Sequence, residues 1–261
     1  MGRYTGIFNQ PFEAGLAYGA GLISILFILI LEKDLSCRLI KPAFLNLGLF
    51  GVVAGGILSV SKVFFPLAIF ISFVFFLWAS KGLSKKIFRN LFAIAIMLPA
   101  FLYFLRDQWS GLNYFLRLVI FDRNTDLLEL FSAGRFSFRS GGNAAVTSHL
   151  NDSNLIFGYG LGSVSAPDNA YLEILYFGGV VGVLIYLIVL LALFHFSIKG
   201  LRRQPVLAKY LISLLVFSLF AGLGAPVFTV NRANFFLIIP LIIGLHVLSL
   251  YRLSHRIIRT N

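Results

Sequence analysis

Seven long apolar stretches divide the chain, and they constrain its fold more than any other feature. A membrane-spanning helix needs about 20 mostly apolar residues. The stretches are continuously apolar rather than alternating, which argues against the strands of a lipid-facing β-barrel. We therefore expect an all-α, polytopic integral membrane protein with about seven transmembrane helices in one membrane domain, residues 1–261. The expected helices lie near residues 12–31, 39–58, 63–79, 87–105, 170–197, 206–223 and 235–253.

Composition supports this fold class. Hydrophobic residues make up 59% of the chain and charged residues only 12%, which is too apolar for a soluble domain of this length. The first stretch lacks the basic segment and small-residue cleavage site of a signal peptide, so we expect it to be a true helix. Cys37 is the single cysteine, which excludes an intrachain disulfide and a cysteine metal cluster.

Basic residues predict the orientation of the helices. Residues 80–90 carry three lysines and one arginine, and the positive-inside rule places them in the cytoplasm. Alternation of the helices then places residues 32–41, residues 198–209 and the C-terminal tail inside, and all three are basic as well. The N-terminus and residues 106–169 are expected outside.

The basic residues on the expected outer side are nearly all arginines. A guanidinium binds phosphate or carboxylate with two parallel hydrogen bonds. An equal number of acidic residues, which include Glu13 and Glu173, lies on the same side, so ion pairing within the protein is an alternative explanation of this bias. The outer bases are Arg3, Lys62, Arg106, Arg117, Arg123, Arg135, Arg139 and Arg232.

The outer segment, residues 106–169, is the one long hydrophilic stretch of the chain, and loops longer than about 15 residues are usually functional. Arg135 and Arg139 are four residues apart, so they share one face if this part is helical. A phosphate between the two guanidiniums would offset their repulsion, and so would Asp126 or Glu129.

Residues 158–163, with the sequence GYGLGS, superficially match a glycine-rich phosphate loop. No strand precedes them, so a nucleotide site is not favoured. A tight turn, whose glycines let the backbone approach a ligand or a neighbouring helix, fits better. His149 has no partner at metal-ligand spacing and no Asp-x-Asp pair lies on the outer side. A catalytic divalent metal is therefore not indicated.

The outer-side motifs, in their order and spacing, resemble the O-antigen polymerase and O-antigen ligase superfamily of bacterial membrane glycosyltransferases (Wzy-like and WaaL-like). The motifs are GRYTGIFNQPFEAG at the start, GGILSVSKVFFPLAIF, SAGRFSFRS, FGYGLGS and DNAYLEILYFGGVVG. Family members usually have more helices, and their Arg-x-Thr-Gly motif, which begins here at Arg3, lies in mid-chain. The chain thus resembles the C-terminal part of such a protein. Asp168 stands where ligases typically carry histidine, which favours a polymerase.

The resemblance implies a substrate and a location. The substrate is a glycan repeat unit on undecaprenyl pyrophosphate, presented at the outer face of the bacterial inner membrane. The N-terminus of the chain would then be outside and the C-terminus cytoplasmic. Membrane lipids and a polysaccharide chain-length regulator are the implied partners, and no cofactor, metal or nucleic acid is expected.

The same resemblance suggests the site residues. Asp168 would act as the base that takes the proton from the attacking sugar hydroxyl, and Arg135 would stabilise the pyrophosphate leaving group. Two alternatives stay open for Asp168, namely an N-cap of the following helix and acceptor binding. The residues expected to bind the pyrophosphate or the glycan are Arg3, Arg139, Asn169 and Tyr171.

Three other functions stay open at this point. A ligase that transfers the glycan to lipid A-core would use the same chemistry with another acceptor. A lipid-linked oligosaccharide flippase would also need arginines for the pyrophosphate, but it should line a transmembrane cavity with charge, and the expected spans are nearly free of charge. A truncated chain without catalytic activity is the third alternative.

Overall fold

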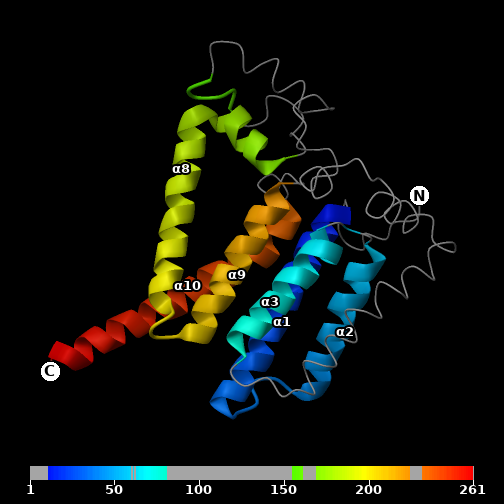
Figure 1. Ribbon diagram of the computed structural model, residues 1–261, viewed down its shortest axis with the longest axis vertical. Helices are drawn as coiled ribbons and strands as arrows, with labels where there is room; N and C mark the ends of the chain where they lie inside the picture. The colour runs from blue at the N-terminus through cyan, green and yellow to red at the C-terminus, as the bar shows by residue number, and fades with distance from the viewer. Residues whose placement is uncertain are drawn as a thin grey trace.

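The computed structural model describes the backbone of residues 11–59, 61, 63–80, 155–160, 169–223 and 231–260. In this part of the chain every regular element is helical, which confirms the all-α prediction for it. Figure 1 shows the arrangement of these elements. They are α1 (Pro11–Leu35), α2 (Pro42–Leu58), the π-helical turn η1 (Val63–Ala68), α3 (Ile69–Ala79), α8 (Ala170–Gly200), α9 (Pro205–Gly222) and α10 (Asn231–Thr260).

The expected apolar stretches correspond to these helices wherever the structure describes them. The fourth stretch, near residues 87–105, lies outside the described residues. Among the described residues, three helices are long and apolar enough to cross a membrane, and they comprise Phe12–Leu35, Ala170–Gly200 and Pro205–Gly222. Shorter apolar helices comprise Pro42–Leu58, Ile69–Ala79 and Phe235–Ser249. A membrane protein is thus supported, and the full set of seven spans stays a prediction.

Many large hydrophobic side chains of the described residues are exposed. On α2, the exposed side chains of Phe44, Leu47 and Phe50 follow one another at three-residue spacing, which places them along one side of the helix. On α10, Ile242 and Ile243 are also exposed. An apolar surface of this extent is unfavourable in water and suits contact with lipid.

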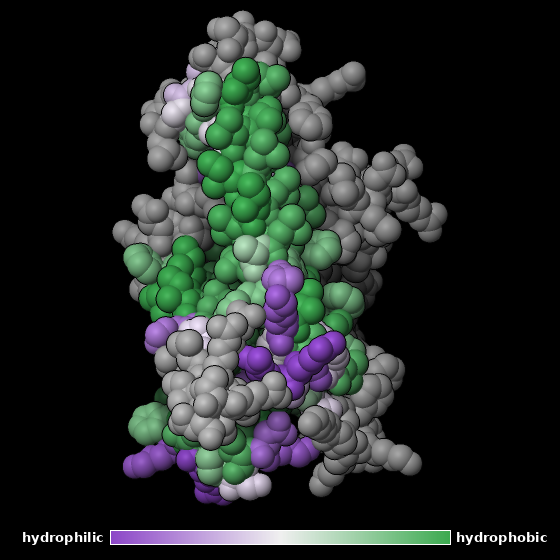
Figure 2. All heavy atoms as spheres, turned by 90° about the vertical axis from the view of Figure 1, so that its left-hand side faces the viewer, coloured by the Kyte–Doolittle hydropathy of each residue, from purple (hydrophilic) through white to green (hydrophobic). Residues whose placement is uncertain are grey.

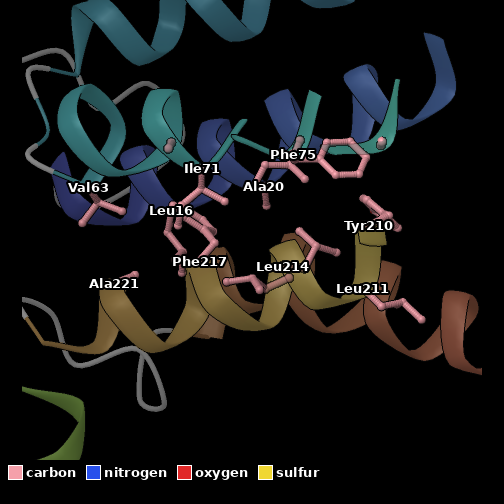
Figure 3. Close-up of a cluster of buried hydrophobic side chains, with 14 of the residues drawn as sticks. Leu16, Ala20, Val63, Ile71, Phe75, Tyr210, Leu211, Leu214, Phe217 and Ala221 are labelled. Atoms are coloured by element: carbon pink, nitrogen blue, oxygen red, sulfur yellow. The ribbon is translucent and has the colours of Figure 1, made fainter. Parts of the chain in front are cut away.

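Helix α1 is the centre of the bundle and contacts α2, η1, α3, α9 and α10. Its first half is rich in glycine and alanine, which lets neighbouring helices approach its backbone closely. A Cβ atom on Gly19 would lie 2.4 Å from the ring of Phe217 in α9 and 2.8 Å from Ala68. Figure 3 shows Phe217 and Leu214 of α9 facing Leu16 and Ala20 of α1 across this contact.

Polar contacts also hold the first half of α9 against α1 and α3. The hydroxyls of Ser24 in α1 and Tyr210 in α9 are 2.8 Å apart, and Phe27 stacks on Tyr210 with ring centroids 4.3 Å apart. Lys209 donates a hydrogen bond of 2.6 Å from its ammonium group to the carbonyl of Trp78, just before the end of α3. The relative positions of α1, α3 and α9 are therefore set by both apolar and polar contacts.

Helix α8 differs from the single span expected over residues 170–197. The backbone breaks at Gly179, where φ is 59° and ψ is −160°. A short helix, Ala170–Gly178, precedes the break, and a long arm, Val180–Gly200, follows it at a steep angle (Figure 1). The arm alone is about 31 Å long, which matches the hydrocarbon core of a bilayer.

Candidate functional site

Asn169 caps the start of α8. Its side-chain oxygen accepts hydrogen bonds from the N–H groups of Tyr171, at 2.9 Å, and Leu172, at 3.3 Å. Its side-chain amide donates to the carbonyl of Leu223, just past the end of α9, at 2.9 Å. The hypothesis that Asp168 is the N-cap is therefore wrong, since the cap lies one residue later. Asp168 itself lies outside the described residues.

Tyr171 also joins α8 to α9. Its hydroxyl donates a hydrogen bond of 2.6 Å to the carbonyl of Leu219, and its ring meets that of Tyr186 edge to face. Asn169 is fully buried and uses both ends of its amide within the protein. These contacts give Asn169 and Tyr171 a structural role at the start of α8, while their role in substrate binding stays a prediction.

Residues 155–160, which include the first half of the GYGLGS motif, dock on α8 at its break. The glycines allow this approach, because both Gly158 and Gly179 have positive φ and their backbones nearly touch. A Cβ atom on Gly158 would lie 2.6 Å from the nitrogen of Gly179. The motif thus makes a close approach to a neighbouring helix, one of the two uses expected from the sequence.

The two motifs nearest the N-terminus meet in the same way. Gly15 of α1 lies against Ser61 in the turn before η1, so closely that a Cβ atom on Gly15 would be 2.6 Å from the Cβ of Ser61. Ser61 is buried, and its hydroxyl accepts a hydrogen bond of 3.3 Å from the N–H of Val63. Ser59 in the same turn donates to the carbonyl of Gly56 at 2.7 Å.

One end of the bundle, which we call the polar end, gathers most of the buried polar groups. It is the end where α1 and η1 begin and α9 ends, as Leu16, Val63 and Ala221 show in Figure 3, and Asn169 brings the start of α8 to it. Buried polar side chains elsewhere in the described residues are three serines. Those at the polar end are Glu13, Ser59, Ser61, Asn169 and Glu173.

Glu13 and Glu173 are the residues that the sequence prediction missed. The side chains are 7% and 1% exposed, although the expected topology placed both carboxylates near the outer surface. Each lies within an apolar run, FEAGLAYG or AYLEILYF. A carboxylate in an apolar span is costly and therefore rare, and it often marks a functional site, so this context was the available signal. Both belong to the candidate site.

The remaining predicted site residues, Arg3, Arg135 and Arg139, lie outside the described residues. Where the structure describes the chain, no group of three or more His, Cys, Asp or Glu side chains could hold a metal ion. Comparison with models of protein families, with curated proteins and with solved structures finds no match.

Proposed function

We propose that this chain is an integral membrane glycosyltransferase that joins undecaprenyl-pyrophosphate-linked repeat units into a surface polysaccharide. The protein would cross the bacterial inner membrane seven times, and transfer would occur at the outer face. Residues 106–169 would pack over the helix ends at the polar end of the bundle. This arrangement gives the reaction access to a lipid-borne substrate from the side of the membrane on which the polymer grows.

One observation carries the proposal: motif segments that are far apart in the sequence meet in space. Gly15 lies against Ser61, and residues 155–160 dock on the helix that begins at Asn169. The side chain of Asn169 in turn bonds to the end of α9. Contacts of this kind would hold the motifs that resemble the polymerase family around one site.

The chemistry requires a base and a group that stabilises the leaving pyrophosphate. The acceptor hydroxyl oxygen attacks the anomeric carbon of the donor, the bond from that carbon to the phosphate oxygen breaks, and the hydroxyl proton moves to the carboxylate of Asp168. Arg135 would bind the negative charge that develops on the pyrophosphate, and Arg3 and Arg139 would help to bind it. The cap bonds of α8 are made by Asn169, so Asp168 is not required as the cap.

The proposal can be tested with the purified chain reconstituted in lipid vesicles that contain lipid-linked repeat units. We expect glycan chains of increasing length and release of undecaprenyl pyrophosphate, without added metal. Arg135→Lys keeps the charge but loses the planar fork, so we expect it to lower chain elongation strongly at equal protein content. Arg123→Lys, at an outer arginine with no assigned role, is the matched control and should elongate chains normally.

Other outcomes would identify other functions. In vesicles that also contain lipid A-core, transfer of the glycan to that acceptor, with no chain growth, would show a ligase. Movement of the lipid-linked unit across the bilayer without any glycosyl transfer would show a flippase. Either outcome would contradict the polymerase proposal, and so would chain growth that is equal in the Arg135→Lys and Arg123→Lys proteins.

A further inference from the structure

The break in α8 exchanges helical hydrogen bonds for bonds to another segment. In an unbroken helix the N–H groups of Val180 and Val181 would donate to the carbonyls of Tyr176 and Phe177. Here Val180 donates to the carbonyl of Leu155, at 2.9 Å, and Val181 to that of Ile156, at 3.1 Å. The freed carbonyls of Tyr176 and Phe177 accept hydrogen bonds from Tyr159 and Gly160, at 2.9 and 3.0 Å.

This exchange meets the condition that a lipid environment imposes on an irregular backbone. Hydrocarbon offers no hydrogen-bond partners, so non-helical segments are stable at membrane depth only if their polar groups are bonded within the protein. Residues 155–160 supply two acceptors and two donors, which replace the two helical bonds lost at the break. Gly158 and Gly179 permit the close contact on which these bonds depend.

In this segment three apolar side chains are exposed, whereas one aromatic side chain packs against α8. Leu155, Ile156 and Phe157 are 46%, 59% and 75% exposed. Tyr159 instead stacks on Tyr176, with ring centroids 5.0 Å apart. Exposure of three consecutive large apolar side chains to water is unfavourable, whereas removal of their surface from water by acyl chains is stabilising.

The position of the segment along α8 points to the same environment. The arm of α8 carries exposed large hydrophobic side chains such as Leu184, Ile188 and Leu191, and Figure 2 shows a hydrophobic surface along the arm with hydrophilic residues beyond its lower end. Lys199 lies near that end. The rise from Val180 to Lys199 is about 28 Å, close to the thickness of the hydrocarbon core, so the break lies near the opposite edge of that core.

We propose that Leu155, Ile156 and Phe157 form an apolar wedge that inserts among the acyl chains of the bilayer, at the edge opposite Lys199. Tyr159, which is partly exposed, then lies beside the wedge at the depth where tyrosine is favoured, while Tyr176 packs beneath it within the protein. The wedge anchors the bend of α8 in the membrane and thereby sets the height of the short helix that begins at Asn169. This inference concerns lipid contact and does not depend on glycosyl transfer.

The depth of the wedge can be measured by spin labelling of the full chain in lipid vesicles. With Cys37→Ser as background, single labels are placed by Phe157→Cys and Ile156→Cys. Ile188→Cys, in the exposed middle of the arm, is the lipid reference. The aqueous reference is a label on native Cys37 in the protein without the Cys37→Ser change, because this cysteine is exposed in the polar turn between α1 and α2. Collisions with oxygen, which concentrates in lipid, are compared with collisions with a water-soluble nickel chelate.

We expect the labels at residues 156 and 157 to collide more with oxygen than with nickel, as the label at residue 188 does. A nickel-dominated result at both positions, as at Cys37, would place the segment in water and overturn the proposal. Low collision rates with both reagents would show that protein covers the segment, and this would overturn it too. The label at Ile156→Cys keeps the side chain of Phe157, so it shows whether the result at residue 157 is only an effect of removing that side chain.

Discussion

The side chain of Asn169 is expected to stabilise the start of α8 through two separable contributions. Its oxygen caps the helix, and loss of such a cap costs about 1 kcal/mol. Its amide satisfies the partly buried carbonyl of Leu223, and leaving such a carbonyl without a donor costs up to about 1–3 kcal/mol. Asn169→Ser keeps a capping oxygen and loses the donor, so we expect about 1–3 kcal/mol of destabilisation. Asn169→Ala loses both, and we expect about 2–4 kcal/mol.

The free energy of unfolding can be measured by titrating the protein in mixed micelles with a denaturing detergent and following helix content. Asn46→Ala, at an exposed asparagine in α2, is the matched control and should be neutral or slightly stabilising, because alanine has the higher helix propensity. If Asn169→Ser and Asn169→Ala were as stable as the parent, the assigned hydrogen bonds would make no measurable contribution to the free energy of unfolding. If Asn169→Ser equalled Asn169→Ala, the cap contribution would be refuted.

Two further predictions concern the break in α8 and the topology. Gly179→Ala should destabilise the protein by more than about 1 kcal/mol, because the backbone conformation at Gly179 is nearly confined to glycine and the new Cβ would lie 2.4 Å from the carbonyl oxygen of Ile156. Gly178→Ala, with nothing within 4 Å, is the control, and equal stability of the two variants in the same titration would contradict the close contact. In intact spheroplasts, a cysteine introduced by Ser148→Cys should react with an impermeant reagent while Cys37 does not, and the opposite pattern would invert the topology.

The helices were predictable because their signal is local. Long apolar runs define the positions of α1, α2, α9 and the arm of α8, and the residue types alone carry that information. The break at Gly179 depends on hydrogen bonds from residues 155–160, which lie about twenty residues earlier in the chain. An unbroken helix and a broken one with a docked segment satisfy the same backbone groups, so the local pattern does not choose between them.

The cap of α8 shows the same limit at the scale of one residue. Asp and Asn cap helices about equally well, so the pair Asp168 and Asn169 leaves two adjacent starting points. The choice of Asn169 reflects its amide donor, which Asp lacks, and the carbonyl of Leu223. That carbonyl is 54 residues away in the chain, so only the packing of α8 against α9 brings it there. The burial of Glu13 and Glu173 likewise depends on neighbouring helices.

Chain elongation by the Asp168→Asn protein tests the proposed glycosyl transfer most directly. Asparagine has nearly the size of aspartate but cannot take up a proton, and the cap bonds of α8 are made by Asn169, so the change should leave the fold intact. Vesicles with equal amounts of parent and variant protein are given lipid-linked repeat units, and glycan length and repeat-unit turnover are followed over time. We expect the variant to slow elongation by about a hundredfold or more. Long chains made at the parental rate would contradict a catalytic role of Asp168 and the proposed site at the start of α8.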